Sequence, residues 1–217
     1  KFFRGRAFLR LQMSWLGRLM LRREQAMYRL LDGVAGVPRC LGVAGETGLA
    51  IEYVSGRPLD HLEGPPPEGF FDQLRALLDQ VHDRGVGYCD ANKRSNILIG
   101  ENGRPYLVDY QISVRRRDDW PWPLCSAAAT AVRYVQRCDL YHLYKHKRRI
   151  CPERLTPEER QLSLRRGRLH SFHRRLTDPW RRMRRFVLRS LHSKGQLESP
   201  TAMLEDHYQP EKATWRS

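Results

Sequence analysis

The sequence predicts an α+β fold, and three observations support this prediction. An apolar stripe recurs at helical spacing over residues 70–84, which is typical of an amphipathic helix. Two short apolar runs, residues 97–99 and 106–108, flank Glu101-Asn102-Gly103, as in a β-hairpin whose turn contains Asn-Gly. The last hundred residues are basic and look helical. We therefore expect helices combined with small antiparallel sheets.

The sequence before residue 70 also contains patterns that predict a helix and a strand. Leucines and methionines recur at helical spacing over residues 14–31, and Asp32-Gly33 ends this helix. Residues 49–54 form an apolar run that predicts a buried strand, and residues 55–58 are expected to break it. The composition of residues 64–67, one glycine and three prolines, predicts a linker.

The C-terminal region is strongly basic. Thr156, Pro157 and Glu159 have the spacing of a helix start, with threonine as the cap. Another helix is expected to begin at Asp178, which is the only acidic residue over positions 165–194. Such a helix could pack on the rest of the protein, lie on an anionic membrane surface or contact nucleic-acid phosphates. We favour packing combined with an anionic contact.

Charge and cysteine content narrow the class of protein. The formal net charge of +15 predicts an anionic partner, which could be nucleic acid, anionic lipid or a phosphorylated substrate. The five cysteines are odd in number and lack CxxC spacing, so we expect a reducing cytoplasm and no disulfide framework. No apolar run approaches the roughly 20 residues of a membrane span. The chain starts with Lys1 and not methionine, so an upstream segment is expected.

Three polar residues carry the chemical prediction. The helix over residues 70–84 leads into a loop that contains Asp90, and Asn96 lies where this loop enters a strand. The hairpin then returns the chain, so Asp109 ends the next strand and converges with Asn96. An amide oxygen and a carboxylate at one place suit Mg²⁺. A further carboxylate on the same loop can accept a proton from an attacking hydroxyl, as phosphoryl transfer requires.

Residues 88–111 resemble the catalytic loop and metal-binding strand of protein kinases, in which Asp-x-x-x-x-Asn precedes Asp-Phe-Gly. The resemblance implies ATP and Mg²⁺ as cofactors, with Asp90 as the catalytic aspartate. It also implies that Asn96 and Asp109 hold Mg²⁺. Lys93 lies within this loop and could contact the transferred phosphate, although it could equally be a solvent-facing lysine.

The departures from the protein-kinase pattern are informative. Tyr88-Cys89 replaces the usual His-Arg, and the gap between Asp90 and Asn96 is one residue longer than usual. Asp109-Tyr110-Gln111 replaces Asp-Phe-Gly, and no Ala-Pro-Glu follows. These features look like those of small atypical bacterial kinases related to the RIO kinases and to lipopolysaccharide core (Kdo) kinases.

The same resemblance suggests roles upstream and downstream of the loop. Glu24, in the first helix, would pair with a strand lysine, for which Lys1 is the candidate. Residues 51–54 resemble the hinge, where backbone groups of Glu52 and Val54 would contact adenine. Asp139 would brace the catalytic loop through backbone hydrogen bonds.

The predicted architecture is thus a protein-kinase-like, two-lobed α+β fold. Residues 1–56 would form a partial N-terminal lobe and hinge, residues 57–195 a mostly helical C-terminal lobe, and residues 196–217 a loose tail. Each selected residue also has an ordinary interpretation, because single loop aspartates, turn asparagines and exposed helix glutamates are common. The histidines show no metal-binding spacing and are expected to be surface or core residues.

The predicted function is transfer of the ATP γ-phosphate to a hydroxyl of a protein or of a sugar or lipopolysaccharide-type acceptor. The positive charge suits an anionic acceptor, and the expected location is the cytoplasm, with peripheral contact at the inner face of the membrane as an option. A pseudokinase that binds without catalysis is an alternative, favoured by Tyr88 in place of histidine. A basic nucleic-acid-binding protein is a second alternative, but it does not explain the loop and hairpin.

Overall fold

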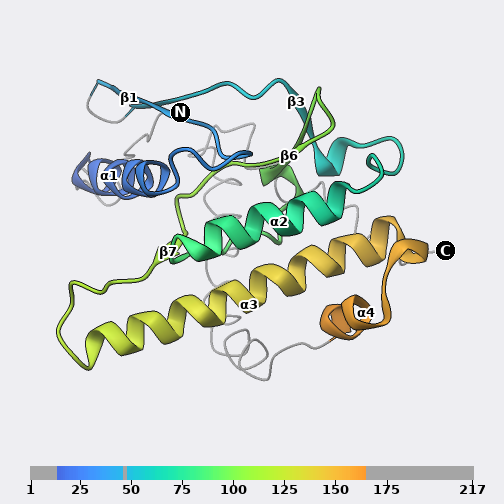
Figure 1. Cartoon of the computed structure of the whole chain (residues 1–217). Helices are drawn as coiled ribbons and strands as arrows, with labels where there is room; N and C mark the ends of the chain where they lie inside the picture. Colours follow the sequence, from blue (N-terminus) through green and yellow to red (C-terminus); the bar gives the residue numbers. More distant parts are fainter. Residues whose placement is uncertain (1–13, 46–47, 165–217) are drawn as a thin grey trace, which may run out of the picture. The chain divides into compact units, whose positions relative to one another are not determined.

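The structure is a computed structural model that describes residues 14–45 and 48–164 (Figure 1). Its helices are α1 Ser14–Leu30, α2 Phe70–Asp83, α3 Leu124–Ile150 and α4 Pro157–Leu164, with short 3₁₀ turns η1 Leu59–His61, η2 Arg94–Asn96 and η3 Pro152–Arg154. Its strands are β1 Cys40–Ala44, β2 Gly48–Ile51, β3 Gly56–Pro58, β4 Val86–Gly87, β5 Ile97–Gly100, β6 Pro105–Leu107 and β7 Val114–Arg115. Lys1, the helix expected from Asp178 and the tail over 196–217 lie outside the described residues.

The N-terminal part of the described chain confirms the helix predicted over residues 14–31 and corrects the strand predicted over residues 49–54. Helix α1 covers almost the whole of residues 14–31 and buries Leu21, Met27 and Tyr28. Strand β2 pairs with β1 in antiparallel fashion but ends at Ile51, so the strand predicted over 49–54 is too long. Beyond it, the Glu52 amide donates to the carbonyl of Arg39 at 2.8 Å.

The segment expected to break the strand pattern instead contains a short strand of its own. Strand β3 pairs with β5, with Gly56 opposite Gly100 and Pro58 opposite Leu98. Proline is tolerated because β3 is an edge strand of the three-stranded sheet β3-β5-β6. A Cβ atom on Gly56 would lie 2.3 Å from the carbonyl oxygen of Ile99, so only glycine permits this close approach.

Helix α2 forms as its apolar stripe predicts. The stripe is fully buried and consists of Phe70, Phe71, Leu74, Leu77, Leu78 and Val81. Gly85 ends the helix in the left-handed conformation with φ of 71°, and its amide donates to the carbonyl of His82 at 2.9 Å. Figure 1 shows α2 alongside α3, against which it packs.

The predicted hairpin is β5-β6, in the register Ile97 to Leu107 and Ile99 to Pro105. Its turn closes with the Gly103 amide donating to the Gly100 carbonyl at 2.8 Å. Gly103 has φ of 75°, which explains the glycine at this position. The hairpin therefore returns the chain from Asn96 to Asp109, as the sequence predicted.

The C-terminal helices of the described part are joined by a buried lysine. The Thr156 amide donates to Glu159 at 3.0 Å and the Glu159 amide donates to the threonine hydroxyl at 3.3 Å, which confirms the predicted cap of α4. The ammonium of Lys147 in α3 lies 2.8 Å from Glu159 and 3.1 Å from Asp72 in α2. One side chain thus links α2, α3 and α4.

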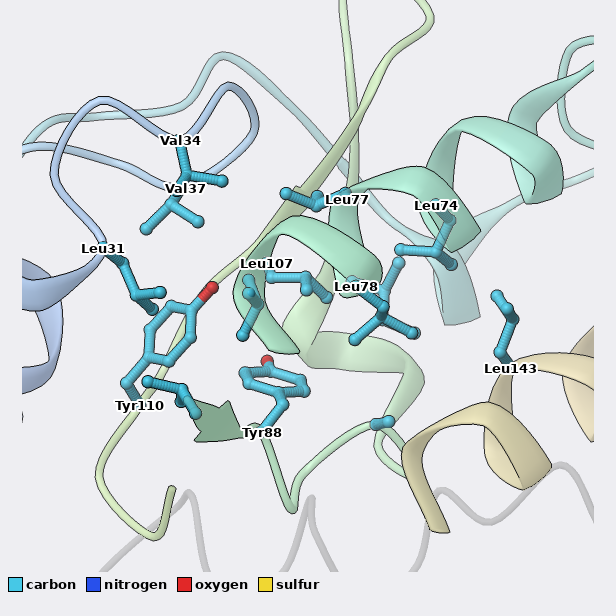
Figure 2. Packing of buried hydrophobic residues seen from close by; sticks show 14 of the residues in the cluster. Leu31, Val34, Val37, Leu74, Leu77, Leu78, Tyr88, Leu107, Tyr110 and Leu143 are labelled. Carbon is cyan, nitrogen blue, oxygen red and sulfur yellow. The ribbon is translucent and has the colours of Figure 1, made fainter. Parts of the chain in front are cut away.

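The hydrophobic core lies between the turn after α1, helix α2, strand β6 and helix α3. Figure 2 shows Leu31, Val37, Leu77 and Leu107 converging there, with the rings of Tyr88 and Tyr110 beside Leu107. Strand β6 leads from this core to Asp109, and the loop that contains Tyr88 leads from it to Asp90. Within residues 14–45 and 48–164, no helix combines the length and apolarity that a membrane crossing needs.

Candidate active site

The loop between β4 and β5 gathers three of the predicted site residues. Asp90 is buried, and its Oδ2 accepts hydrogen bonds from Asn96 Nδ2 and Lys93 Nζ, each at 2.9 Å. The Lys93 amide also donates to the Asp90 carbonyl at 3.0 Å, which closes a tight turn. The side chains of Asp90, Lys93 and Asn96 are therefore one hydrogen-bonded cluster, which we call the Asp90 cluster.

Asp109 lies two residues after the end of β6, and the backbone just before it is paired with Asn96 of the Asp90 cluster. The Val108 amide donates to the Asn96 carbonyl at 3.1 Å, so the residue before Asp109 is paired with Asn96. The Asp109 amide donates to the hydroxyl of Tyr28 at 3.3 Å. The predicted convergence of Asn96 and Asp109 thus exists at the level of the backbone.

Over residues 14–45 and 48–164, two non-glycine residues have left-handed backbones, and both belong to this site. Cys89, immediately before Asp90, has φ of 68°, and Asp109 has φ of 65°. Residues other than glycine are seldom found in this region, and such strain is concentrated at functional sites. The surrounding contacts hold these backbones in place, which is consistent with a site whose two aspartates must be aimed.

Asp139 has the bracing role predicted for it. It is fully buried in α3, and its carboxylate accepts the amide of Tyr88 at 2.8 Å and that of Cys89 at 3.0 Å. His82 Nε2 lies 3.1 Å from the same carboxylate. Burial raises the pKa of Asp139, although these hydrogen bonds oppose the shift.

Helix α3 also holds the residues that follow Asp90. His146 Nε2 lies 2.9 Å from the Ala91 carbonyl, so this nitrogen carries the proton. Burial lowers the pKa of His146 to about 4, and the imidazole is neutral at pH 7. Lys145 Nζ donates to Asn92 Oδ1 at 3.1 Å. The loop is therefore attached to α3 both before and after Asp90.

Glu24 lies on the same side of α1 as the contact to Asp109. It is fully buried, one turn before Tyr28. Burial raises the pKa of Tyr28, and the negative charge of Glu24 raises it further. Glu24 and the Asp109 backbone thus approach the same hydroxyl. Its predicted partner, Lys1, lies outside the described residues.

The two predicted adenine-contacting residues lie apart from the Asp90 cluster. The Glu52 carboxylate accepts hydrogen bonds from the Arg39 amide at 3.1 Å and from Arg39 Nε at 3.3 Å. These hydrogen bonds lower the pKa of Glu52. The carboxylate and the amide of Glu52 both pair with Arg39, so the predicted adenine contact falls to its backbone carbonyl. Among the described residues, no backbone hydrogen bond involves the Val54 amide.

Sequence reasoning missed several residues that build the site. The Tyr88 hydroxyl lies 3.3 Å from the Asn96 carbonyl and also donates to the Val108 carbonyl. Ser113 Oγ donates to the Tyr88 carbonyl at 2.9 Å. These partners are backbone groups, which leave no sequence signal. His146 did leave one, because it lies seven residues after Asp139 and hence on the same face of α3.

The donor set fits Mg²⁺. Asn96 gives its Nδ2 to Asp90, which leaves Oδ1 as the atom available to a cation, and Asp109 adds a carboxylate. Mg²⁺ is commonly held by one or two such oxygens, completed by water and substrate phosphates. No group of three or more histidine, cysteine, aspartate or glutamate side chains with metal-binding geometry occurs in the part of the chain that the structure describes.

Comparisons with known proteins find similarity to kinases. The chain is 24% identical over 150 residues to the serine/threonine-protein kinase OXI1 of Arabidopsis thaliana, covering 65% of this chain and 33% of that protein. It superimposes on the Rio2 kinase of Chaetomium thermophilum with a TM-score of 0.52 and 19% identity, covering 73% of this chain and 50% of that one. No protein-family model matches the chain.

A second structure of the same Rio2 kinase, in an ADP/Mg²⁺-phosphoaspartate complex, gives a TM-score of 0.50 and 18% identity, covering 75% of this chain and 51% of that one. The chain thus spans about a third of the OXI1 kinase and about half of the Rio2 chain. As the sequence predicted, the chain has an α+β, protein-kinase-like fold, similar to that of the atypical kinase Rio2.

Proposed function

We propose that this protein is an atypical kinase that transfers the γ-phosphate of ATP to a hydroxyl group. The observation that supports this most is the Asp90 cluster, placed at the end of the β5-β6 hairpin and braced by Asp139. A catalytic carboxylate must be held in one orientation, and the contacts of Asp90 supply that. The last hydrogen bond of the hairpin joins the Val108 amide to the Asn96 carbonyl. Asp109, the second predicted metal ligand, is the next residue in the chain.

Asp90 would act as the base that orients the acceptor. Its Oδ2 receives the hydrogen bonds of Asn96 and Lys93, so Oδ1 is the oxygen that faces the acceptor hydroxyl. As the hydroxyl oxygen bonds to the γ-phosphorus, its proton passes to Asp90 and the bond from phosphorus to the bridging oxygen breaks, releasing ADP. Lys93 would stabilise negative charge on the transferred group.

The remaining residues would bind the nucleotide. Asn96 and Asp109 would hold Mg²⁺, which when bound neutralises phosphate charge. Lys1 and Glu24 would fix the α- and β-phosphates, as the resemblance to protein kinases suggests. Backbone groups of Glu52 and Val54 would contact adenine, and the absence of a backbone partner for the Val54 amide among the described residues supports this.

We propose an anionic acceptor, with a sugar or lipopolysaccharide-type glycolipid preferred over a protein. The loop after β7 supports contact with a membrane surface. Trp122 is 82% exposed and Leu124 is 54% exposed, while the ring of Trp120 stacks under the guanidinium of Arg117 at 4.8 Å. Tryptophan favours the boundary between water and lipid. We infer a cytoplasmic protein with peripheral contact at the inner face of the membrane.

Turnover of ATP labelled on its γ-phosphate tests the proposal, with the full-length protein, Mg²⁺ and an Asp90→Asn variant. Asp83→Asn is the matched control, because Asp83 is an exposed carboxylate at the end of α2. We expect Asp90→Asn to reduce labelled phosphate transfer or release by about 10²-fold or more, and Asp83→Asn to leave it unchanged. Binding of ATP without turnover by the wild type would instead support the pseudokinase alternative, and equal turnover in all three proteins would contradict the role of Asp90.

A further inference from the structure

The hydroxyl of Tyr88 occupies a special place between the two predicted metal ligands. It lies 3.3 Å from the carbonyl oxygen of Asn96 and donates to the carbonyl of Val108, the residue before Asp109. We propose that Tyr88 is a positioning residue, whose hydroxyl holds the backbones of Asn96 and Asp109 in the register needed for metal binding. The inference rests on the proposed kinase function.

Every polar group of Tyr88 is used. Its amide donates to Asp139 at 2.8 Å, and its carbonyl accepts from Ser113 Oγ at 2.9 Å. The Ser113 carbonyl in turn accepts from Arg23 in α1 at 2.9 Å. Through its backbone amide, its backbone carbonyl and its hydroxyl, this one residue therefore connects α3, the segment after Asp109 and the end of the hairpin. Such a residue has little freedom to move its hydroxyl.

The contact is made at the last hydrogen bond of the hairpin. There the Val108 amide donates to the Asn96 carbonyl at 3.1 Å, and the next residue, Asp109, leaves the ladder with φ of 65°. Without the Tyr88 hydroxyl, the Val108 carbonyl would lose its partner at the point where the strained backbone begins. A small shift of Val108 passes directly to Asp109, because the two residues share a peptide bond.

A neighbouring tyrosine provides a control inside the same cluster. The ring centroids of Tyr88 and Tyr110 are 5.0 Å apart, and both residues are fully buried (Figure 2). Burial raises the pKa of both tyrosines, so both hydroxyls are neutral. The Tyr110 hydroxyl, however, has no hydrogen-bond partner among the described residues. Removing it tests the loss of a buried hydroxyl while the contacts of the Tyr88 hydroxyl with Asn96 and Val108 remain.

This assignment reverses one sequence interpretation. Tyr88 in place of the usual histidine suggested a protein that has lost catalysis. The structure instead places its hydroxyl against the backbone carbonyls of Asn96 and of Val108, the residue before Asp109. These contacts give Tyr88 a structural role that the pseudokinase interpretation did not include.

The experiment compares Tyr88→Phe with Tyr110→Phe in the full-length protein. For each, the Mg²⁺ concentration that gives half-maximal ATP turnover is measured, together with nucleotide binding with and without Mg²⁺. We expect Tyr88→Phe to raise that Mg²⁺ concentration by about 10- to 100-fold, as partners of metal ligands do. Its metal-free nucleotide binding should be unchanged. Tyr110→Phe should match the wild type in both measurements.

Wild-type Mg²⁺ dependence in a folded Tyr88→Phe protein would overturn the inference, as would an equal change in both variants. A wild-type protein without Mg²⁺-dependent ATP binding would instead overturn the proposed function, so the two failures are distinct. Should Tyr88→Phe fail to fold, Ser113→Ala takes its place, because it removes the hydrogen bond that fixes the Tyr88 carbonyl and so lets the Tyr88 hydroxyl move away from Asn96 and Val108. We expect it to shift the Mg²⁺ requirement upward by a smaller factor, and no shift would overturn the inference.

Discussion

The carboxylate of Asp139 lies 2.8 Å from the amide nitrogen of Tyr88, although the two residues are 51 positions apart in the sequence. Its other oxygen accepts the amide of Cys89 at 3.0 Å. A buried helix residue thus sets the backbone conformation of the residues immediately before Asp90. The geometry of the candidate active site therefore depends on the packing of α3.

Substitution of Asp139 by alanine should strongly destabilise the protein. The change would leave two loop amides without their acceptor, and the carboxylate is fully buried. Loss of such buried partners costs about 3–5 kcal/mol of the free energy of unfolding. Asp139→Asn keeps one acceptor oxygen and should lose less. Urea unfolding measures both, and an alanine variant within about 0.5 kcal/mol of the wild type would contradict the bracing role.

Acid should weaken the attachment of the loop through His146. Burial lowers the pKa of this imidazole from 6.5 to about 4, so the folded state accepts its proton less readily than the unfolded state. The stabilisation is complete above pH 6.5 and is lost as the pH falls toward 4. The full difference is about 3 kcal/mol.

His146→Gln offers the matched comparison, because glutamine does not titrate but retains an N–H donor for the Ala91 carbonyl. The free energies of unfolding of wild type and variant are measured at pH 7 and at pH 4.5. The wild type should lose more stability than the variant between these values. Parallel losses in the two proteins would show that His146 does not titrate as described.

Two glycines in the turn after α1 should respond differently to alanine. Both have positive φ, 79° at Gly33 and 97° at Gly36. A Cβ atom on Gly36 would lie 2.7 Å from the Pro105 carbonyl oxygen, whereas nothing lies within 4 Å at Gly33. Gly33→Ala should therefore cost only the left-handed backbone, about 1–2 kcal/mol.

Gly36→Ala should cost clearly more, because it also pushes β6 away from the turn. The carbonyl of Gly36 accepts the Leu107 amide at 2.9 Å, so this contact lies two residues from Asp109. Thermal or urea unfolding of the two variants measures the difference. Equal destabilisation would mean that the turn and β6 are not in close contact.

Trp122 should contribute to binding of anionic vesicles. Its side chain is 82% exposed, and burial of such a side chain in a lipid interface contributes about 1.5–3 kcal/mol. Trp122→Ser should thus weaken co-sedimentation with phosphatidylserine-containing vesicles by roughly tenfold or more. Leu41→Ser is the control, since Leu41 is also exposed (65%) but lies on β1. The same loss in both variants, or none in either, would argue against a membrane contact at this loop.

The sequence was most informative where local signals decide the structure. The stripe of α2, the Asn-Gly turn of the hairpin and the Thr156 cap of α4 all appear as predicted. Because the hairpin could be predicted, the approach of the Asn96 and Asp109 backbones at its open end could be predicted too. Asp139 was found through a family resemblance and not through a local signal.

The sequence was least informative where a distant partner decides. Strand β3 pairs with β5 because Gly56 can approach the Ile99 carbonyl closely. Residues 55–58 alone contain no pattern that predicts this pairing. Strand β2 ends at Ile51, and the Glu52 amide after it donates to the carbonyl of Arg39, 13 positions earlier in the chain. The Tyr88 hydroxyl binds backbone carbonyls, which every residue possesses, so no pattern of side chains could reveal it.

The central claim is that Asn96 and Asp109 form a metal-dependent ATP site. It is tested most directly by calorimetric titration of the full-length protein with ATP, with and without Mg²⁺, in the wild type, Asp109→Asn and the exposed control Asp83→Asn. We predict that Mg²⁺ strengthens ATP binding in the wild type and the control, and that Asp109→Asn abolishes this dependence. ATP binding that is absent from the folded wild type, or that keeps its Mg²⁺ dependence in Asp109→Asn, would contradict the account.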